Sequence, residues 1–439
     1  MEKTKKSPRF WLALTLASFV GQVAWVVENM YFNVFIYKMF RASAADISLM
    51  VAASAVAATV TTLLIGALSD KLGKRRIFIS AGYILWGISI LSFAMIRTDI
   101  IEKFIPTTTS AASVGVSLVI IMDCVMTFFG SSANDACFNA WLTDSTDATN
   151  RGAAEGVNAM MPLIAVLAVF GGFMPFDLDR PSSWVTIYII IGAVVIAAGI
   201  LGFFLIRDSD VRPAGDGKYF SNIFYGFRPS VVRREPVLYV TLAAFAVFGI
   251  SIQIFMPYLI LYYSVSLGMD NYVLIMAPAI IIAAAATVFA GKCYDRFGFA
   301  RTVLPALAVL AAGYTVLFFF RSPVPVFIGS LLMMSGYLSG AAIFGAMLRD
   351  HTPPRRAGMF QGLRIVGQVL IPGILGPAVG AAVLKGADKV IGNDGTASFI
   401  PNRNIFLAAL IAAVLILPAL FGVFTLKKKT EDVKNAENR

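Results

Sequence analysis

The chain has few charged residues: Asp, Glu, Lys and Arg make up 14% of its 439 positions, whereas a soluble domain carries about 25%. With 58% hydrophobic residues and a mean hydropathy of +0.78, the molecule cannot face water on all sides. Histidine occurs once and the three cysteines form no CxxC motif, so the sequence offers no metal-ligand cluster and predicts unpaired thiols. A GxxxxGK[ST] phosphate loop is also missing, which argues against ATP as an energy source.

Twelve apolar stretches are each long enough to cross a hydrocarbon core of about 30 Å as a helix. They lie near residues 10–37, 46–69, 77–96, 113–138, 153–175, 184–206, 236–263, 271–293, 301–320, 324–348, 358–384 and 404–426. Their apolarity is continuous and does not alternate, which predicts helices and not the strands of a closed barrel. We therefore expect an all-α integral membrane protein with twelve transmembrane helices.

Basic residues gather on one side of these helices. Of 36 Lys and Arg residues, 26 lie in loops on the side of the N-terminus, nine lie on the opposite side, and Arg364 lies within a helix. Basic loops stay in the cytoplasm, so we expect both termini there and a multi-pass protein of the plasma or inner membrane. The net charge of +11 then reflects topology, and no nucleic-acid partner is expected.

A charged motif occurs twice, 225 positions apart. Each copy has a Gly, an Asp at +4, a base at +5, a Gly at +7 and an Arg at +10. The copies are Gly66, Asp70, Lys71, Gly73 and Arg76, and Gly291, Asp295, Arg296, Gly298 and Arg301. Such duplication in a membrane chain is typical of secondary transporters. It predicts two six-helix halves, 1–206 and 236–439, joined by a cytoplasmic linker over 207–235 with an amphipathic segment; the second half ends in a short cytoplasmic tail.

A second internal match precedes the fifth helix of each half. Asp144, Arg151 and Gly152 align with Asp350, Ala357 and Gly358 at an offset of 206. A helix N-terminus carries about half a positive charge. We therefore expect Asp70, which ends helix 2, to face the start of helix 11 near Arg356. By the same reasoning, Asp295, which ends helix 8, should face the start of helix 5 near Arg151.

The first motif resembles the loop between helices 2 and 3 of the major facilitator superfamily, and the second resembles its weaker copy between helices 8 and 9. The resemblance implies a cavity lined by helices 1, 4, 7 and 10, and contacts that lock the cytoplasmic face while the protein opens outward. The predicted cytoplasmic gate consists of Gly66, Asp70, Gly73, Arg75, Arg151, Asp295, Arg296, Gly298 and Arg356.

Four charged side chains fall at membrane depth within the predicted helices: Glu28, Asp123, Asp135 and Arg364. Charges at membrane depth are costly and are functional by default. Asp123 shares one helix face with Thr127, Ser131 and Asn134; an alternative for Asp123 is a structural ion pair with Arg364. The predicted binding set for solute and cation is Glu28, Asp123, Arg364, Trp25, Asn29, Asn134, Gln253, Tyr258 and Gln368.

Carboxylates, amides and aromatic rings together suit a polyhydroxylated ligand, although each aromatic residue also fits an interface belt. The stretch 134–152 resembles the helix 4 to 5 region of the glycoside–pentoside–hexuronide:cation symporters, the group of the melibiose permease. That resemblance implies sugar-binding acids at Glu28 and Asp123 and a positive residue at Arg364. One departure is that helix 2, over 50–59, lacks the acids that this group uses for its cation. This departure favours a proton, carried by Glu28 or Asp123, over sodium.

The sequence thus predicts a secondary transporter that moves a sugar or a similar small polar solute with a cation. A proton-driven exporter of amphiphiles is the alternative, supported by 12% aromatic residues and by a Pro372, Gly376 and Pro377 cluster in helix 11. A non-transporting receptor is a third possibility. The expected partners are the solute, a proton or sodium ion and the lipid bilayer; we expect no cofactor, no enzymatic activity and a monomer.

Overall fold

The computed structural model describes residues 6–104, 110–147, 150–208, 224–352, 362–391 and 397–437; within these ranges the side chains of Ala67, Asp70, Tyr225 and 427–437 are not described. In this part of the chain, twelve helices are long and apolar enough to cross a membrane, which confirms the predicted fold class. The spans are Pro8–Phe40, Ala44–Gly66, Arg75–Phe93, Ala111–Asp144, Arg151–Phe173, Pro181–Leu205, Pro236–Ser266, Tyr272–Phe297, Phe299–Phe319, Pro323–Asp350, Gly362–Leu384 and Asn404–Leu426.

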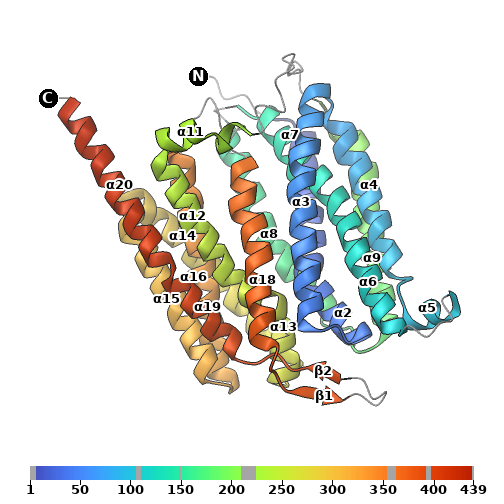
Figure 1. The fold of residues 1–439 in the computed structure, drawn as a ribbon. Helices are drawn as coiled ribbons and strands as arrows, with labels where there is room; N and C mark the ends of the chain where they lie inside the picture. The colour runs from blue at the N-terminus through green and yellow to red at the C-terminus, as the bar shows by residue number, and fades with distance from the viewer. Residues whose placement is uncertain are drawn as a thin grey trace. The chain divides into compact units, whose positions relative to one another are not determined.

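The chain forms two compact units, each described by itself. Unit 1 comprises Met1–Phe220 with Val390–Ser398, and unit 2 comprises Ser221–Lys389 with Phe399–Arg439. The helices of unit 1 are α1 (Pro8–Val26), η1 (Val27–Tyr31), α2 (Phe32–Phe40), α3 (Ala44–Leu72), α4 (Arg75–Phe93), α5 (Thr98–Phe104), α6 (Ala111–Gly130), η2 (Ser131–Phe138), α7 (Asn139–Asp144), α8 (Arg151–Phe173) and α9 (Pro181–Leu205) (Figure 1).

Unit 2 repeats the pattern of long helices with short connections. Its helices are η3 (Tyr225–Phe227), α11 (Pro229–Arg234), α12 (Pro236–Phe255), η4 (Met256–Tyr258), α13 (Leu259–Leu261), η5 (Tyr262–Ser266), α14 (Tyr272–Phe297), α15 (Phe299–Phe319), α16 (Pro323–Asp350), η7 (Val366–Leu370), α18 (Ile371–Leu384), α19 (Asn404–Val414) and α20 (Ile416–Glu437). Between α18 and α19, β1 (Lys389–Ile391) and β2 (Ala397–Phe399) form a two-stranded sheet.

Local signals set several helix ends. Ser7 caps α1 with its side chain, and Pro8 occupies the first turn, where a missing N–H costs nothing. Ser43 and Asp46 form a capping box at the start of α3. Gly73 ends α3 with φ +63°, and Gly298 separates α14 from α15 with φ +76°. Both glycines belong to the repeated motif, whose tight turns therefore require a residue without a Cβ.

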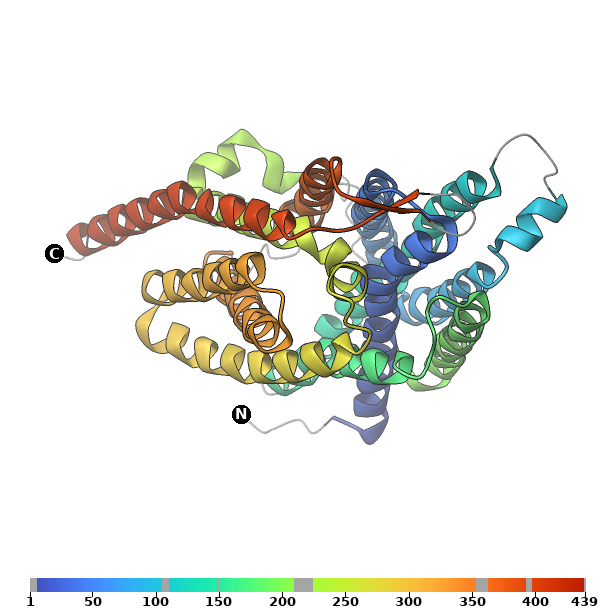
Figure 2. The same cartoon turned by 90° about the horizontal axis from the view of Figure 1, so that it is seen from below.

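Glycines also allow close helix packing within each unit. In unit 1, α4 and α9 lie side by side (Figures 1 and 2), and a Cβ on Gly87 would lie 2.7 Å from the carbonyl oxygen of Gly192. In unit 2, a Cβ on Gly380 of α18 would lie 2.4 Å from the carbonyl oxygen of Ile254 in α12. Small residues at such contacts are the usual means of helix association in membranes.

Four membrane-spanning helices contain a π-helical segment that the sequence did not predict. These segments are η1, η2, η5 and η7. A π-helical turn widens the helix locally and is frequent at functional sites. Glu28 and Asn29 lie in η1, Asn134 lies in η2 and Gln368 lies in η7. Four of the nine predicted binding residues are therefore carried by these segments.

Candidate functional site

Glu28 is buried in the interior of unit 1, with 6% of its surface exposed. Its Oε1 accepts a hydrogen bond from Ser54 Oγ of α3 at 2.8 Å and from Thr127 Oγ1 of α6 at 2.9 Å. The two hydroxyl oxygens lie 2.8 Å from each other. Helices 1, 2 and 4 of the chain therefore meet at this carboxyl group. Ser54 is not among the residues that the sequence singled out.

Asp123 is the second buried carboxyl, with 2% of its surface exposed. It lies one turn before Thr127 on α6, and its charge interacts with that of Glu28. Within the described residues, Glu28 Oε2 and Asp123 Oδ1 are buried without a hydrogen-bond partner. Buried polar atoms are almost always hydrogen-bonded, so each unpartnered oxygen indicates a place where a proton, water or ligand is held.

The wider turn of η2 carries a second polar contact. Asn134 Nδ2 donates to the hydroxyl of Tyr83, which donates to the carbonyl oxygen of Ala17. A Cβ on Gly21 would lie 2.2 Å from Asn134 Nδ2, so Gly21 makes room for this bond. Asn134 thus joins helices 1, 3 and 4. Its amide nitrogen is engaged within the protein, which fits a structural role.

Asp135 follows Asn134 in η2 and accepts a hydrogen bond from Ser131 Oγ at 2.9 Å. Its charge interacts with that of Glu28. The α-helical spacing predicts that Asp135 is turned away from the face of Asp123, but η2 interrupts that spacing. Asp135 is accordingly a third carboxyl near Glu28.

Two indole groups of unit 1 pack on each other near Gly130. The rings of Trp25 and Trp86 are 5.0 Å apart, and both Nε1 atoms are buried without a partner among the described residues. Gly130 allows this contact, because a Cβ there would lie 2.7 Å from Trp86 and 3.1 Å from Trp25. Asn29 is exposed, and its Nδ2 donates to the carbonyl oxygen of Trp25. Unit 1 therefore holds unpartnered donors as well as unpartnered acceptors.

The remaining predicted binding residues belong to unit 2. Gln253 of α12 packs against α18, where a Cβ on Gly376 would lie 2.3 Å from its own Cβ. Tyr258 is fully buried and donates to the carbonyl oxygen of Pro377 at 3.3 Å. Both side chains of helix 7 thus contact α18.

On helix 11, Arg364 Nε and Gln368 Nε2 are buried and have no hydrogen-bond partner in the described part of the chain. This helix is the one that the sequence predicts to hold the positive partner of the acids. The pairing of Arg364 with the acids of unit 1 stays a prediction.

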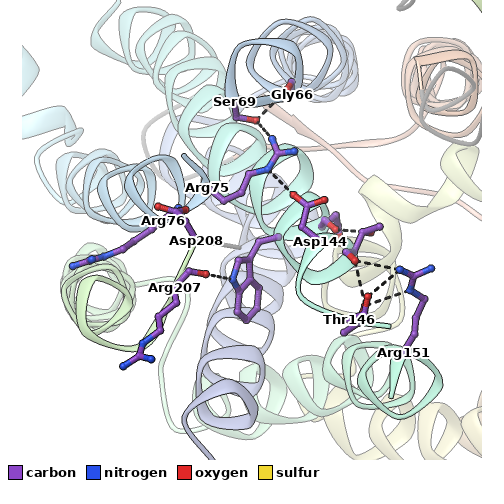
Figure 3. A network of polar contacts seen from close by, with 12 residues as sticks. Gly66, Ser69, Arg75, Arg76, Asp144, Thr146, Arg151, Arg207 and Asp208 are labelled. Atoms are coloured by element: carbon purple, nitrogen blue, oxygen red, sulfur yellow. Dashed lines mark hydrogen bonds and ion pairs between the residues drawn. The ribbon is translucent and has the colours of Figure 1, made fainter. Parts of the chain in front are cut away.

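Arg75, one of the predicted gate residues, bonds to two side chains (Figure 3). Its Nε lies 3.1 Å from Asp144 Oδ2, and its Nη1 donates to Ser69 Oγ, whose hydroxyl lies 3.0 Å from the carbonyl oxygen of Gly66. The side chain of Arg75 is 9% exposed and that of Asp144 is 21% exposed. The first motif is thereby tied to the end of helix 4 inside unit 1.

Arg151 begins α8 and closes the loop before it. Its guanidinium group contacts Thr146 through the side-chain oxygen at 3.3 Å and the carbonyl oxygen at 3.1 Å, and it also reaches the carbonyl oxygen of Thr143 (Figure 3). Cations near carbonyl groups at a helix end are favourable. The structure thus assigns Arg151 contacts within unit 1.

In the second motif, Asp295 is exposed and Arg296 lies over the ring of Phe297 at 5.1 Å. The neighbouring Tyr294 donates its hydroxyl hydrogen to Asp350 Oδ2. Arg356 and the side chain of Asp70 lie outside what the structure describes, so the predicted contacts of Asp70 with Arg356, and of Asp295 with helix 5, stay predictions.

A helical membrane protein with a duplicated motif and charged groups buried in its helices has the build of a secondary transporter. A model of the Major Facilitator Superfamily matches residues 10–377 and again 274–439. Since the first match covers most of the chain, the chain belongs to the Major Facilitator Superfamily, a family of transporters.

Solved structures of transporters share the fold at low sequence identity. The nucleoside transporter NupG is 12% identical, with a TM-score of 0.69 and 94% of this chain and 98% of that chain covered. A bacterial homologue of the human lysosomal transporter Spinster, inward-facing and unoccupied, is 16% identical, with a TM-score of 0.69 and coverage of 95% and 98%. A D-xylose–proton symporter is 15% identical, with a TM-score of 0.68 and coverage of 94% and 97%. No curated protein sequence matches the chain.

Proposed function

We propose that this transporter carries a small polar solute, a sugar or glycoside, together with a proton by alternating access across the plasma or inner membrane. The observation that carries the proposal is the buried pair of Glu28 and Asp123, each with one unpartnered carboxyl oxygen. In a membrane interior such a pair is costly unless it binds protons or ligand. One acid loads the proton, and the other accepts hydrogen bonds from solute hydroxyl groups.

Two aromatic side chains of unit 1 support a hydroxylated solute. The indole N–H groups of Trp25 and Trp86 are unpartnered donors, and an indole ring offers a flat face to the apolar side of a sugar. The fold neighbours include a D-xylose–proton symporter and a nucleoside transporter, whose names concern those proteins alone. In the proposal Arg364, on helix 11, balances whichever acid is ionised.

Coupling to a proton is preferred over coupling to sodium. Helix 2 contributes the hydroxyl of Ser54 to Glu28 and has no acid there. Carboxyl groups with few neutralising partners bind protons readily in such surroundings.

The alternative of proton-driven amphiphile export receives no support from helix 11. Gly376 and Gly380 are explained by close packing of α18 on α12, where a Cβ would overlap Gln253 and Ile254. The glycine and proline cluster therefore has a structural reason in this chain.

Uptake into proteoliposomes tests the proposed function. Purified protein should accumulate a sugar or glycoside from a panel when the outside is acidic, and an imposed sodium gradient alone should not drive accumulation. Accumulation driven only by sodium, or movement of amphiphilic dyes with no sugar transported, would show that the proposal is wrong.

A further inference from the structure

Three oxygen atoms from three helices form a closed triangle at Glu28. The sides are Ser54 Oγ to Glu28 Oε1 at 2.8 Å, Thr127 Oγ1 to Glu28 Oε1 at 2.9 Å, and Ser54 Oγ to Thr127 Oγ1 at 2.8 Å. All three separations are hydrogen-bond lengths for an O–H donor and an oxygen acceptor. The helices joined are α3, α6 and, through η1, the first membrane span.

The triangle needs three hydrogens, but its two hydroxyl groups supply only two. Ser and Thr each carry one O–H donor, and an ionised carboxylate accepts hydrogen bonds but donates none. With Glu28 ionised, both hydroxyls point to its Oε1, and the Ser54 and Thr127 oxygens are left 2.8 Å apart with no hydrogen between them. With a proton on Oε1, each oxygen donates once and accepts once, and all three contacts are satisfied.

We propose that Ser54 and Thr127 are positioning residues that close a three-membered hydrogen-bonded ring with protonated Glu28, and that release of the proton breaks the Ser54–Thr127 bond. Glu28 then accepts from both hydroxyls, while α3 and α6 lose their direct polar link. Protonation is thereby tied to the contact between helices 2 and 4. Use of this link in transport rests on the proposed function, whereas the ring itself does not.

A metal ion does not fit at the centre of the ring. An ion in the plane would lie about 1.6 Å from each oxygen, the side of about 2.8 Å divided by √3, whereas even Mg²⁺ requires about 2.0–2.1 Å. The described titratable groups that interact with Glu28 are Asp123 and Cys124 on α6 and Asp135 in η2. None of them supplies a positive charge that would favour an ionised Glu28.

Infrared spectroscopy tests the protonation of Glu28 directly. The full-length protein in lipid nanodiscs, without solute or gradient, should show a protonated-carboxyl band at neutral pH that disappears at alkaline pH and is missing in Glu28→Gln. The Asp123→Asn variant identifies any band that belongs to the neighbouring acid. A spectrum at neutral pH in which Glu28→Gln removes only carboxylate absorption would overturn the proposal.

A double-variant cycle tests the link between the hydroxyls. In the protonated ring, Ser54→Ala and Thr127→Val each remove two bonds and the double variant removes three. Its loss in melting temperature should therefore be about three quarters of the summed single losses at neutral pH. At alkaline pH, where the Glu28 band is gone, the losses should add. Additive losses at both values of pH would overturn the ring.

Two matched controls separate the ring from general packing. Thr59 of α3 and Ser132 of η2 are buried, and among the described residues their hydroxyls bond to backbone oxygens of their own membrane spans, at Ala55 and Phe128. Thr59→Val combined with Ser132→Ala should be additive at every pH. Thr127→Ser keeps the hydroxyl and therefore every ring bond, so its combination with Ser54→Ala should be additive at every pH, and Thr127→Ala replaces Thr127→Val in the cycle if the valine variant folds poorly. Since no measurement here involves transport, failure of the ring and failure of the transport proposal are separable.

Discussion

The two units differ in the polar side chains that they bury. Unit 1 buries two carboxyl groups, Glu28 and Asp123, whereas the described part of unit 2 buries none; its buried polar groups are hydroxyls of Ser, Thr and Tyr and the nitrogens of Arg364 and Gln368. In unit 2 the Tyr263 and Ser330 hydroxyls lie 2.6 Å apart, and the Ser251 and Tyr314 hydroxyls lie 3.1 Å apart. Neutral pairs of this kind hold helices together without exchanging protons near neutral pH. Under the proposed function, the acid that binds the proton therefore lies in unit 1.

The repeated motif differs between the units as well. In unit 1, Arg75 bridges Ser69 and Asp144 in a mostly buried position. At the matching positions of unit 2 stand Ala300, Tyr294 and Asp350, and the Tyr294 hydroxyl reaches Asp350 with no arginine between them. Asp350 is exposed. Both units therefore link the end of their second helix to the aspartate that ends their fourth helix. Among the described residues, the link contains a mostly buried ion pair in unit 1 and a tyrosine hydroxyl in unit 2.

The largest expected effect follows from the difference between the interiors. Glu28→Gln or Asp123→Asn should abolish uphill uptake, reducing it to the level of protein-free liposomes. The acid that carries the proton should leave counterflow partly intact, while the acid that binds solute should lose both activities. Uphill uptake and counterflow are measured side by side, with Arg364→Ala tested for an altered pH dependence.

Tyr263→Phe is the control in unit 2, because it removes the hydroxyl bonded to Ser330 and keeps the ring. It should retain accumulation. If both acid variants still accumulate solute, neither Glu28 nor Asp123 carries the coupled proton. Asp135 and Glu155 are then the next candidates.

The second effect concerns the buried ion pair of the first motif. Arg75→Ala leaves Asp144 and Ser69 without their shared donor, and we expect a loss of about 2–4 kcal/mol in unfolding free energy, since removing one partner of a buried pair is costly. Thermal unfolding at one scan rate in mild detergent measures it. The adjacent Arg76 is the matched control: its backbone N–H bonds Asp208 at 2.7 Å, and this bond survives Arg76→Ala. Equal losses in the two variants would contradict a special role for Arg75.

A third expectation treats the two motifs as parts of one gate. Asp70→Asn and Asp295→Asn should both favour inward-open states, because each removes a negative charge that is predicted to face a helix N-terminus. The readout is a several-fold faster alkylation of single cysteines placed along the cytoplasmic halves of helices 4 and 10. Unchanged alkylation rates in both variants would contradict the gate interpretation. A faster rate in Asp70→Asn alone would show that only the first motif acts as a gate.

Much of the fold could be predicted because its signals are local in the sequence. The apolar runs define the twelve spans, and Gly73 and Gly298 mark turns that need a positive φ. The partners of Glu28 could not be predicted in the same way. Ser54 stands in an alanine-rich run, where a serine ordinarily packs against a neighbouring helix, and only the tertiary fold brings it to the carboxyl group.

The π-helical segments could not be predicted from the sequence for a similar reason. The spacing of Asp123, Thr127, Ser131 and Asn134 describes an α-helix, but η2 begins at Ser131 and changes the direction of the residues that follow. Such widened turns depend on contacts across the helix bundle, as in the bond from Asn134 to Tyr83. The spacing of residues along one helix does not reveal contacts with other helices.

The smallest effect concerns the second motif. Tyr294→Phe removes a hydroxyl bonded to an exposed carboxylate, so water can replace the lost partner of Asp350. We expect a cost of about 1 kcal/mol or less in unfolding free energy, well below that of Arg75→Ala. The same thermal unfolding measurement applies. If the loss in unfolding free energy is as large as that of Arg75→Ala, the Tyr294–Asp350 bond stabilises unit 2 as much as the buried arginine stabilises unit 1. The two motifs would then differ in residue type but not in their contribution to stability.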